Sequence, residues 1–270
     1  MCIRDSNTIV GHGADQVKQQ ITGSNRFVLQ TEQLGTGHAV SQVLPHLRED
    51  ALCLILYGDV PLIEPDTLKQ LIEVTTSGSM SILTVNLKDA TGYGRIVRDA
   101  KGRVISIVEQ KDASPEQLDI KEINTGIMAV YQQHLAQWLP NLSNDNAQGE
   151  YYLTDIVAMA VSDGVVINTS EPTMSEEVEG VNNKSQLAAL ERFYQKQQAE
   201  ALMVAGATLA DPARIDVRGS VSVGKDVFID VNCIFKGSVV LGNNVSIGPN
   251  CIIENANLLD NVVVHANSVI

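Results

Sequence analysis

Residues 217–257 read VRGSVS-VGKDVF-IDVNCI-FKGSVV-LGNNVS-IGPNCI-IENAN, a run of six-residue repeats. The first residue of every block is aliphatic or aromatic: Val217, Val223, Ile229, Phe235, Leu241, Ile247 and Ile253. The residue four positions later is Val221, Val227, Cys233, Val239, Val245, Cys251 and, in the last block, Asn257. A fixed period held over seven cycles predicts stacked coils of a β-solenoid.

The hexads resemble the hexapeptide repeat of left-handed parallel β-helix proteins, in which three hexads make one triangular coil. The phase slips by one residue near Leu258, and the pattern then resumes. Cys233 and Cys251 are 18 positions apart, or three hexads, so we expect them to stack on adjacent coils about 4.8 Å apart. A reducing compartment would leave them unpaired.

The composition fits two folded units, because a chain of 270 residues with 44% hydrophobic residues is near the size at which single cores divide. The formal charge of −13 argues against binding to long nucleic acids, whose phosphates need clustered cations, but it allows a mononucleotide substrate. We find no run of about 18 apolar residues and no signal peptide, so we expect a cytoplasmic protein with no membrane segment. The four cysteines have neither zinc-site nor redox-motif spacing.

Four segments follow from the patterning. Residues 1–6 fit no element, and we expect them to be non-native. Residues 7–184 alternate short apolar runs with helical patterns, which predicts an α/β domain with a Rossmann-like, mixed and mostly parallel sheet. Residues 185–212 predict a connecting helix that continues to about Leu209, and residues 213–270 form the β-helix.

The stretch from Leu54 to Leu62 reads LILYGDVPL, an apolar strand that ends at Gly58 and Asp59. Ligands of open α/β sheets gather beyond the carboxyl ends of strands, so Asp59 is a candidate ligand for a divalent cation. Mg²⁺ needs only one or two protein oxygens when water and phosphates complete its shell. Asn182, in VEGVNN, is the candidate second ligand. The alternative for Asp59 is an ordinary turn or helix-cap aspartate.

Other motifs are ambiguous when they are taken singly. The glycines of QTEQLGTGHA, residues 30–39, permit close approach of a base or phosphate, or they mark a helix start. The TGYGR stretch is typical of a turn between strands. Glu109 is at the predicted end of one strand and Asn124 at the predicted start of another, so each of these residues also has a structural explanation.

Together and in order, the stretches QLGTGHA, LYGDVPL, TGYGRI, VEQKDA, EINTGI, QGEYYLTD and VEGVNN resemble the bacterial bifunctional N-acetylglucosamine-1-phosphate uridylyltransferases and glucosamine-1-phosphate acetyltransferases. The resemblance extends from about Thr8 to the last residue, and the hexapeptide repeats occupy the place they have in that family. It implies an enzyme that joins UTP and N-acetylglucosamine 1-phosphate into UDP-N-acetylglucosamine with release of pyrophosphate, for peptidoglycan and lipopolysaccharide synthesis.

The resemblance also implies roles for individual residues. Asp59 and Asn182 would bind Mg²⁺. Gln30, Gly35 and Thr36 would contact the uridine, Tyr57 and Gly58 would lie close to the sugar nucleotide, and Gly94, Glu109 and Asn124 would bind the N-acetylglucosamine. Gln30 can offer uracil both a donor and an acceptor. No covalent or acid–base residue is implied, because positioning and charge neutralisation carry phosphoryl transfer.

The family's glycine-rich phosphate loop has no counterpart in residues 1–6, and its acetyltransferase residues lie in later coils. We therefore expect the chain to be a fragment that does not turn over UTP, and we expect acetyl-CoA to be used only by the full-length protein. His265 is assigned a structural or solvated role. The resemblance further implies a homotrimer built through the β-helix.

Two other functions remain open at this stage. One is another sugar-1-phosphate nucleotidyltransferase, of the ADP-glucose or dTDP-glucose type, which would share the sheet and the metal aspartate. The other is a non-catalytic scaffold assembled through the β-helix.

Overall fold

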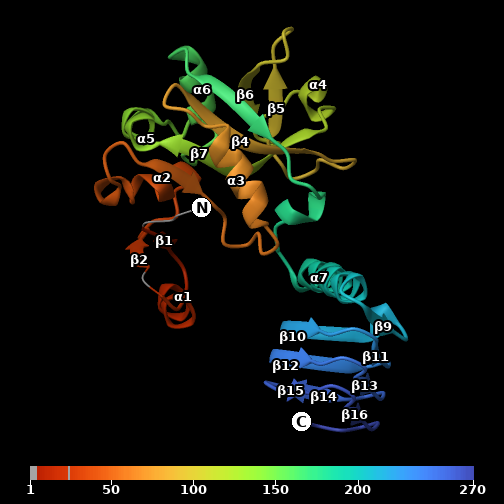
Figure 1. The fold of residues 1–270 in the computed structure, drawn as a ribbon. Coiled ribbons are helices and arrows are strands. Elements are labelled where there is room, and N and C mark those ends of the chain that lie inside the picture. Colours follow the sequence, from red (N-terminus) through yellow and green to blue (C-terminus); the bar gives the residue numbers. More distant parts are fainter. Residues whose placement is uncertain (1–4, 24) are drawn as a thin grey trace. The chain divides into compact units, whose positions relative to one another are not determined.

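The computed structural model describes residues 5–23 and 25–270, and they form two compact units, residues 1–180 and 181–270 (Figure 1). The division falls four residues before the boundary predicted at residue 184. Residues 1–4, the larger part of the segment predicted to be non-native, lie outside the described residues.

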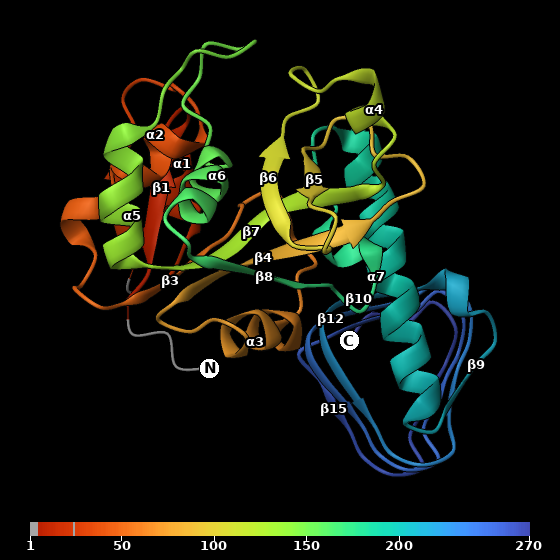
Figure 2. The ribbon, with the colours of Figure 1, turned by 90° about the horizontal axis from the view of Figure 1, so that it is seen from above.

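The first unit is built on a six-stranded sheet with the order β6-β5-β7-β4-β8, in which β3 also pairs with β7. Its strands are β3 (Leu52–Ile55), β4 (Ser79–Asn86), β5 (Arg95–Arg98), β6 (Val104–Val108), β7 (Glu122–Tyr131) and β8 (Val166–Ser170). Figure 2 shows their arrangement. Strands β3, β4, β5 and β8 share one direction, because β3, β4 and β5 are each antiparallel to β7 and β8 is parallel to β4.

The predicted mixed α/β sheet is therefore confirmed, with one feature that alternation alone did not reveal. Strand β7 lies between β3 and β4 and pairs antiparallel with both, so the two parallel-running strands do not hydrogen-bond to each other. A ten-residue strand can pair on both edges along its length, and this makes β7 the centre of the sheet.

Helices cover both faces of this sheet, and alternate side chains of the central strands supply the two cores. One core joins Met80, Ile82, Met128 and Val130 to α5 (Gln132–Trp138), α6 (Asp155–Ser162) and part of α2 (Thr36–Ser41). The other core joins Leu83, Ile127 and Ala129 to α3 (Pro65–Glu73). Figure 2 shows α3 on the face opposite to α5 and α6. The short α4 spans Pro115–Leu118.

A smaller parallel pair precedes this sheet. Strand β1 (Asn7–Val10) pairs with β2 (Arg26–Leu29), and α1 (Ala14–Gln20) connects them. No residue of α1 is buried, so this helix contributes little to either core. Strand β2 nevertheless leads directly to Gln30, the first of the predicted site residues.

The second unit opens with α7 (Lys184–Val204), which ends earlier than predicted. The sequence pattern extended the helix to Leu209, but Gly206 takes a φ of 110° and Ala207–Leu209 form strand β9 of the first coil. Glycine at that left-handed position ends a helix without Cβ strain.

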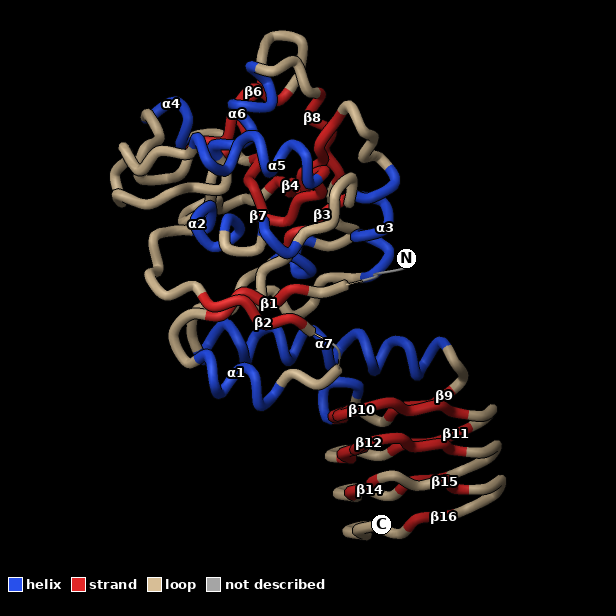
Figure 3. The backbone as a smooth tube through the Cα atoms, turned by 90° about the vertical axis from the view of Figure 1, so that its left-hand side faces the viewer, coloured by secondary structure: helices blue, strands red, loops and turns tan. Residues whose placement is uncertain are grey.

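The remaining strands stack in register as a β-solenoid, seen edge-on in Figure 3. They are β10 (Ile215–Val223), β11 (Val227–Ile229), β12 (Cys233–Leu241), β13 (Ser246–Ile247), β14 (Ile252–Glu254), β15 (Asn257–Leu258) and β16 (Val263–Val264). Partners in the early coils are 18 residues apart, as in Ile215↔Cys233 and Phe228↔Ser246. The predicted three-hexad coil is thus confirmed.

The predicted phase slip is also present, but its place differs. Partner spacing falls to 17 residues at Val240↔Asn257, whereas Lys236↔Glu254 still keeps 18. Asn257, which holds the repeat position of the last block, is exposed, and Ala256 packs against the core instead. The coil is therefore one residue shorter between Glu254 and Ala256, and this shortening keeps an apolar residue, Ala256, inside the coil.

Asparagines turn the corners of these coils. Asn232, Asn250 and Asn267 have φ near 61°, a conformation that asparagine tolerates better than other residues with a Cβ. Their side chains form a ladder, in which Asn232 Nδ2 donates to Asn250 Oδ1 at 2.8 Å and Asn250 Nδ2 donates to Asn267 Oδ1 at 3.3 Å. The ladder ties consecutive coils together where their backbones turn.

Helix α7 covers the first edge of the solenoid. Ala199 and Leu202 belong to the solenoid core, and the buried Gln195 pairs with the backbone of β10 as a neighbouring strand would. Val217 N donates to Gln195 Oε1 at 2.6 Å, and Gln195 Nε2 donates to Val217 O at 2.9 Å. A side-chain amide has the donor and acceptor of a peptide group, so it can satisfy an open strand edge.

Cys53, Cys233 and Cys251 are free thiols, and Cys233 and Cys251 occupy equivalent places on adjacent coils. His265 is exposed on the solenoid. Among the described residues, no helix has both the length and the apolar character needed to span a membrane.

Candidate functional site

Strand β3 ends beneath the candidate site. Tyr57, Gly58 and Asp59 come one residue after its end at Ile55, and Val60 then turns back into the core that contains α3. Asp59 and Gly58 are exposed, whereas Tyr57 is largely covered. An added Cβ at Gly58 would meet nothing within 4 Å, so no steric contact inside the protein demands glycine there.

A bulge in β7 holds Tyr57 and Asn124 in place. The β4 register shifts between Ile82 and Thr84, and Gly126 at this point has a φ of 84°. A Cβ on Gly126 would lie 2.5 Å from Tyr57 Cε2, so the tyrosine ring rests directly against this glycine.

The same bulge orients the Asn124 amide. Gly126 N donates to Asn124 Oδ1 at 3.1 Å, and Asn124 N donates to Gly94 O at 2.8 Å. Because Oδ1 is occupied, the Asn124 side chain presents its Nδ2 hydrogens as donors. Asn124 on β7 is thus brought together with Gly94, the residue just before β5.

Glu109 lies over Gly94. A Cβ on Gly94 would come within 3.3 Å of both Glu109 carboxylate oxygens, so glycine leaves the room that this carboxylate uses. Thr154 Oγ1 donates to Glu109 Oε1 at 3.0 Å. Burial raises the pKa of Glu109, the Thr154 hydrogen bond opposes this shift, and the charges of Asp112 and Asp155 add to it.

The glycines near α2 are explained by close packing within the protein. Gly35 has a φ of 108°, and its Cβ would lie 2.7 Å from Tyr151 O. Gly37 N donates to Tyr151 O at 2.8 Å, and Tyr151 N donates to Leu34 O at 2.8 Å. The segment around Tyr151 therefore lies along the start of α2, at Thr36.

Gln30 makes hydrogen bonds within the protein. Its Nε2 donates to Gly35 O at 3.1 Å and lies 3.0 Å from His38 Nδ1, which must accept because an amide nitrogen only donates. Both Nε2 hydrogens are therefore engaged. In this arrangement only Oε1 is left for a ligand, and the contact of Gln30 with uridine stays a prediction.

Tyr57 and Thr36 join these two groups of residues. Burial raises the pKa of Tyr57, a hydrogen bond with the Thr36 side chain lowers it, and the charges of Glu109 and Asp59 raise it further. Thr36 Oγ1 also accepts from Leu153 N at 3.1 Å. The structure thus connects the predicted residues of the first unit through Tyr57.

Asp59 suits a divalent cation. Within residues 5–23 and 25–270 its carboxylate makes no hydrogen bond or ion pair, so its oxygens are free to bind a ligand. The described chain holds no cluster of three or more His, Cys, Asp or Glu side chains able to bind a metal. A cation here would therefore complete its shell with water and substrate oxygens, as Mg²⁺ commonly does.

Asn182, the predicted second ligand, belongs to the second unit and is exposed. Its backbone N donates to Gln186 Oε1 at 2.8 Å, next to the Asn183 cap of α7. Its pairing with Asp59 stays a prediction.

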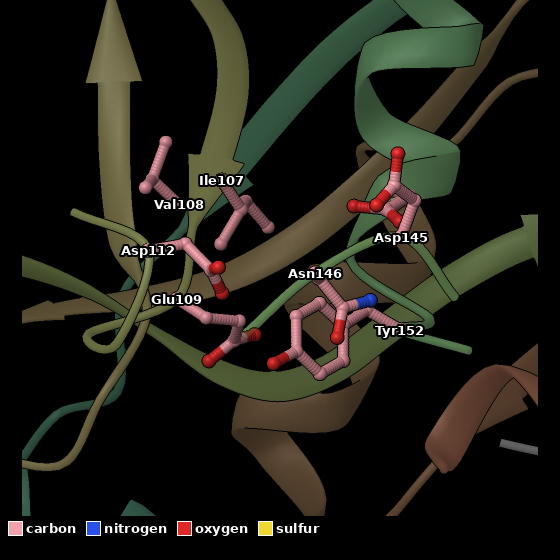
Figure 4. Close-up of a pocket in the computed structure, with 8 residues that line it drawn as sticks. Ile107, Val108, Glu109, Asp112, Asp145, Asn146 and Tyr152 are labelled. Carbon is pink, nitrogen blue, oxygen red and sulfur yellow. The ribbon is translucent and has the colours of Figure 1, made fainter. Parts of the chain in front are cut away.

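A hollow of ≈ 210 Å³ adjoins Glu109, and Figure 4 shows Glu109 and Tyr152 bordering it. It is lined by Ile107, Val108, Glu109, Asp112, Asp145, Asn146, Tyr152 and Asp155. Four carboxylates repel phosphate but can accept hydrogen bonds from hydroxyl groups. This side of the site therefore suits an uncharged, hydroxyl-bearing part of a ligand.

Sequence reasoning did not assign roles to Gly126, His38, Tyr151 or Thr154. All four occur within motifs that carried the resemblance, namely EINTGI, QLGTGHA and QGEYYLTD. The motifs marked these positions, but only the fold shows that Gly126 supports Tyr57 and that Thr154 holds Glu109.

An α/β sheet with a free aspartate beyond one strand, followed by hexapeptide coils, is the arrangement of nucleotide-transferring enzymes with a solenoid domain. The sequence model described as nucleotidyl transferase matches residues 10–215, and the chain belongs to this family. The model described as bacterial transferase hexapeptide (six repeats) matches residues 220–255.

Curated relatives are similar over most of the chain. The bifunctional protein GlmU of Cellvibrio japonicus is 61% identical over 229 residues, which are 84% of this chain and 51% of that protein. The GlmU of Saccharophagus degradans is 62% identical over 231 residues, 85% of this chain and 51% of the relative. The GlmU of Marinobacter nauticus is 58% identical over 265 residues, 98% and 58% respectively. The chain spans about half the length of these relatives.

Proposed function

We propose that the first unit is the sugar-nucleotide site of an enzyme that transfers uridylyl from UTP to N-acetylglucosamine 1-phosphate. A phosphate oxygen of the sugar phosphate attacks the α-phosphorus of UTP, a new P–O bond forms, and the bond to the departing pyrophosphate breaks. The proposal rests on membership of the nucleotidyl transferase family, the similarity to the GlmU relatives and the resemblance in seven ordered motifs.

The observation that carries the proposal is the linked arrangement around Tyr57. Thr36 lies on one side of it, Gly126 and Asn124 lie on another, and the charge of Glu109 acts on its pKa. A ligand along this line would meet Thr36 at its uridine end and Glu109 at its sugar end.

The polar groups have complementary tasks. Gln30 Oε1 can accept the uracil N3–H, because its Nε2 is engaged by the protein. Asn124 Nδ2 donates to the sugar, and the Glu109 carboxylate accepts from sugar hydroxyls. Gly58 leaves open space beside these groups, because a Cβ there would meet nothing within 4 Å.

Asp59 would hold Mg²⁺ with Asn182 as the second protein ligand. A bound cation would neutralise the phosphates that must approach one another. The acidic hollow beside Glu109 disfavours phosphate there, and this supports placing the phosphates toward Asp59. The chain's own residues position the substrates, and none is needed as a covalent nucleophile.

The test is calorimetric titration of UDP-N-acetylglucosamine into the chain with Mg²⁺ and with EDTA, alongside Asp59→Ala. We expect binding that Mg²⁺ strengthens in the wild type and does not strengthen in Asp59→Ala. Lys69→Ala is the matched control, because Lys69 lies on α3 at the surface and pairs only with Asp66 among the described residues. Wild-type binding that ignores Mg²⁺ would contradict the metal assignment.

The nucleotide is tested by comparing UTP with ATP and dTTP, since the ADP-glucose and dTDP-glucose enzymes would share the sheet and aspartate. We expect UTP to bind most tightly. Preference for ATP or dTTP would favour the other nucleotidyltransferases, and no binding of any nucleotide would favour the scaffold. A pyrophosphate-release assay tests the further expectation that these 270 residues bind without turnover.

For the whole protein we propose a second activity, acetylation of glucosamine 1-phosphate by acetyl-CoA, and a homotrimer formed through the solenoid. The hexapeptide match and the bifunctional name of the relatives support this. Sedimentation of the full-length protein at several concentrations tests the trimer.

A further inference from the structure

A buried hydrogen bond joins two segments that meet beside Asp59. Thr67 Oγ1 donates to Glu177 Oε2 at 2.5 Å, and the two residues are 110 positions apart in the sequence. Thr67 lies in the first turn of α3, and Glu177 lies in a short 3₁₀ helix, Ser175–Val178. Thr67 is 3% exposed and Glu177 is 2% exposed, so both groups are removed from water.

The burial of Glu177 needs an explanation. A carboxylate taken out of water is costly unless hydrogen bonds compensate it. Glu177 has one such bond on each oxygen, since Met174 N donates to Oε1 at 3.1 Å and Thr67 donates to Oε2. The first bond closes its own turn, whereas the second fastens that turn to α3. Of these two hydrogen bonds, the second is therefore the one that can help to set where the turn lies.

The turn leads directly to the candidate metal ligand. Val178 packs in the same core as Val60, the residue after Asp59, and as Leu68 of α3. Two residues further, a Cβ on Gly180 would lie 3.6 Å from Asp59 Oδ2. The backbone at Gly180 therefore runs past the Asp59 carboxylate, and it does so within the first unit.

Helix α3 is itself the continuation of the Asp59 loop. The chain runs from Asp59 through Val60 to α3, which begins at Pro65, so the Thr67–Glu177 bond closes a loop around the carboxylate. One side of that loop carries Asp59 and the other carries Gly180. The hydrogen bond joins the two sides of this loop.

We propose that Thr67 and Glu177 are positioning residues for a divalent cation at Asp59. They hold the 178–180 segment against Asp59, and they thereby set the space in which a hydrated cation and a substrate phosphate can bind. This inference rests on the proposed function, because it requires that Asp59 bind the cation. Supporting residues of this kind typically change metal affinity about 10-fold to 100-fold when removed.

The experiment measures how strongly Mg²⁺ improves the binding of UDP-N-acetylglucosamine, as the ratio of the Kd in EDTA to the Kd in Mg²⁺. Thr67→Val removes the hydroxyl with little change of shape, and we expect the ratio to fall about tenfold. Thr67→Ser restores a hydroxyl and should restore most of the ratio. The Kd in EDTA should change little in both variants, since neither residue belongs to the nucleotide or sugar contacts.

Thr75→Val is the matched control for a structural effect. Thr75 is also buried and lies just after α3, with its Oγ1 2.8 Å from Leu71 O and 2.7 Å from Ser81 Oγ, but it is not bonded to the 175–180 segment. Thr75→Val should lower the unfolding temperature as Thr67→Val does, but it should leave the ratio of the Kd in EDTA to the Kd in Mg²⁺ unchanged.

The outcomes separate the two proposals. If the ratio of the two Kd values is equal in the wild type, Thr67→Val and Thr75→Val, the positioning role is overturned. The metal site at Asp59 still stands in that case if Asp59→Ala abolishes the Mg²⁺ effect. Equal loss in both threonine variants would also overturn the positioning role, since general loosening would then be the cause. A wild type without any Mg²⁺ effect would refute the proposed function itself.

Discussion

Replacing Gly126 with alanine should weaken the binding of UDP-N-acetylglucosamine, because the added methyl group would enter the space of the Tyr57 ring. Its Cβ would lie 2.5 Å from Tyr57 Cε2 and 2.8 Å from Cζ. Carbon atoms pack at about 3.5–4.0 Å, so the ring must move by about 1 Å. That movement would disturb the hydrogen bond of Tyr57 with Thr36.

The magnitude has two parts. A residue with a Cβ at φ 84° costs about 1–2 kcal/mol of folding stability. If displacement of the Tyr57 ring removes one neutral hydrogen bond from the complex with ligand, the loss is about 0.5–1.5 kcal/mol, and the Kd rises about twofold to tenfold. Calorimetry in Mg²⁺ measures the second part, and thermal unfolding followed by circular dichroism measures the first.

Gly102→Ala separates the two parts. Gly102 has a similar φ of 79° in the turn between β5 and β6, but a Cβ there would meet nothing within 4 Å. It should lower stability by a similar amount and leave the Kd unchanged. The reasoning is refuted if Gly126→Ala keeps the wild-type Kd, or if Gly102→Ala raises the Kd as much.

Three further outcomes are expected. Asn124→Asp keeps the acceptor for Gly126 N but loses the Nδ2 donor, so calorimetry should show affinity at least about tenfold weaker, and unchanged affinity would contradict the donor role. Burial raises the pKa of Glu109 above its ordinary value of 4.5, so the stability from its protonated form is present below about 4.5 and is lost as the pH rises through the raised pKa. Glu109→Gln should therefore melt above the wild type at pH 7 and show no advantage at pH 4, and an advantage equal at both pH values would contradict this. Gln195→Ala leaves both Val217 backbone groups unpaired, at a cost of at least about 2 kcal/mol, so hydrogen exchange at the Val217 amide should become faster. Lys196→Ala, at an exposed position, should not change this exchange rate, and an unaltered rate in Gln195→Ala would show that the side chain does not cap the solenoid.

The sequence by itself determined the repeating architecture and the family. A period of six is visible in any stretch of the solenoid, because each coil repeats the same environment and selects the same residue type. Some strand ends of the first unit were also predictable, since Glu109 directly follows β6 and Asn124 lies near the start of β7, as expected. Such local patterns need no knowledge of which strands pair.

Tertiary structure decided what depends on contacts between distant segments. The place of β7 between β3 and β4 follows from long-range pairing, and alternation of strands and helices does not specify it. Ala256 packs against the solenoid core although it does not hold the repeat position in the strict hexad count, because packing of the core selects the apolar residue. The engaged Gln30 amide depends on Gly35 and His38 taking their folded positions.

The Thr67–Glu177 bond shows the physical reason most clearly. Neither residue belongs to a recognisable pattern, because a buried threonine and a buried glutamate are each unremarkable in sequence. Their meaning arises only when folding brings together two positions that are 110 residues apart and excludes water from both. Sequence periodicity reports which face of an element is apolar, whereas the partner of a polar group is decided by the packed fold.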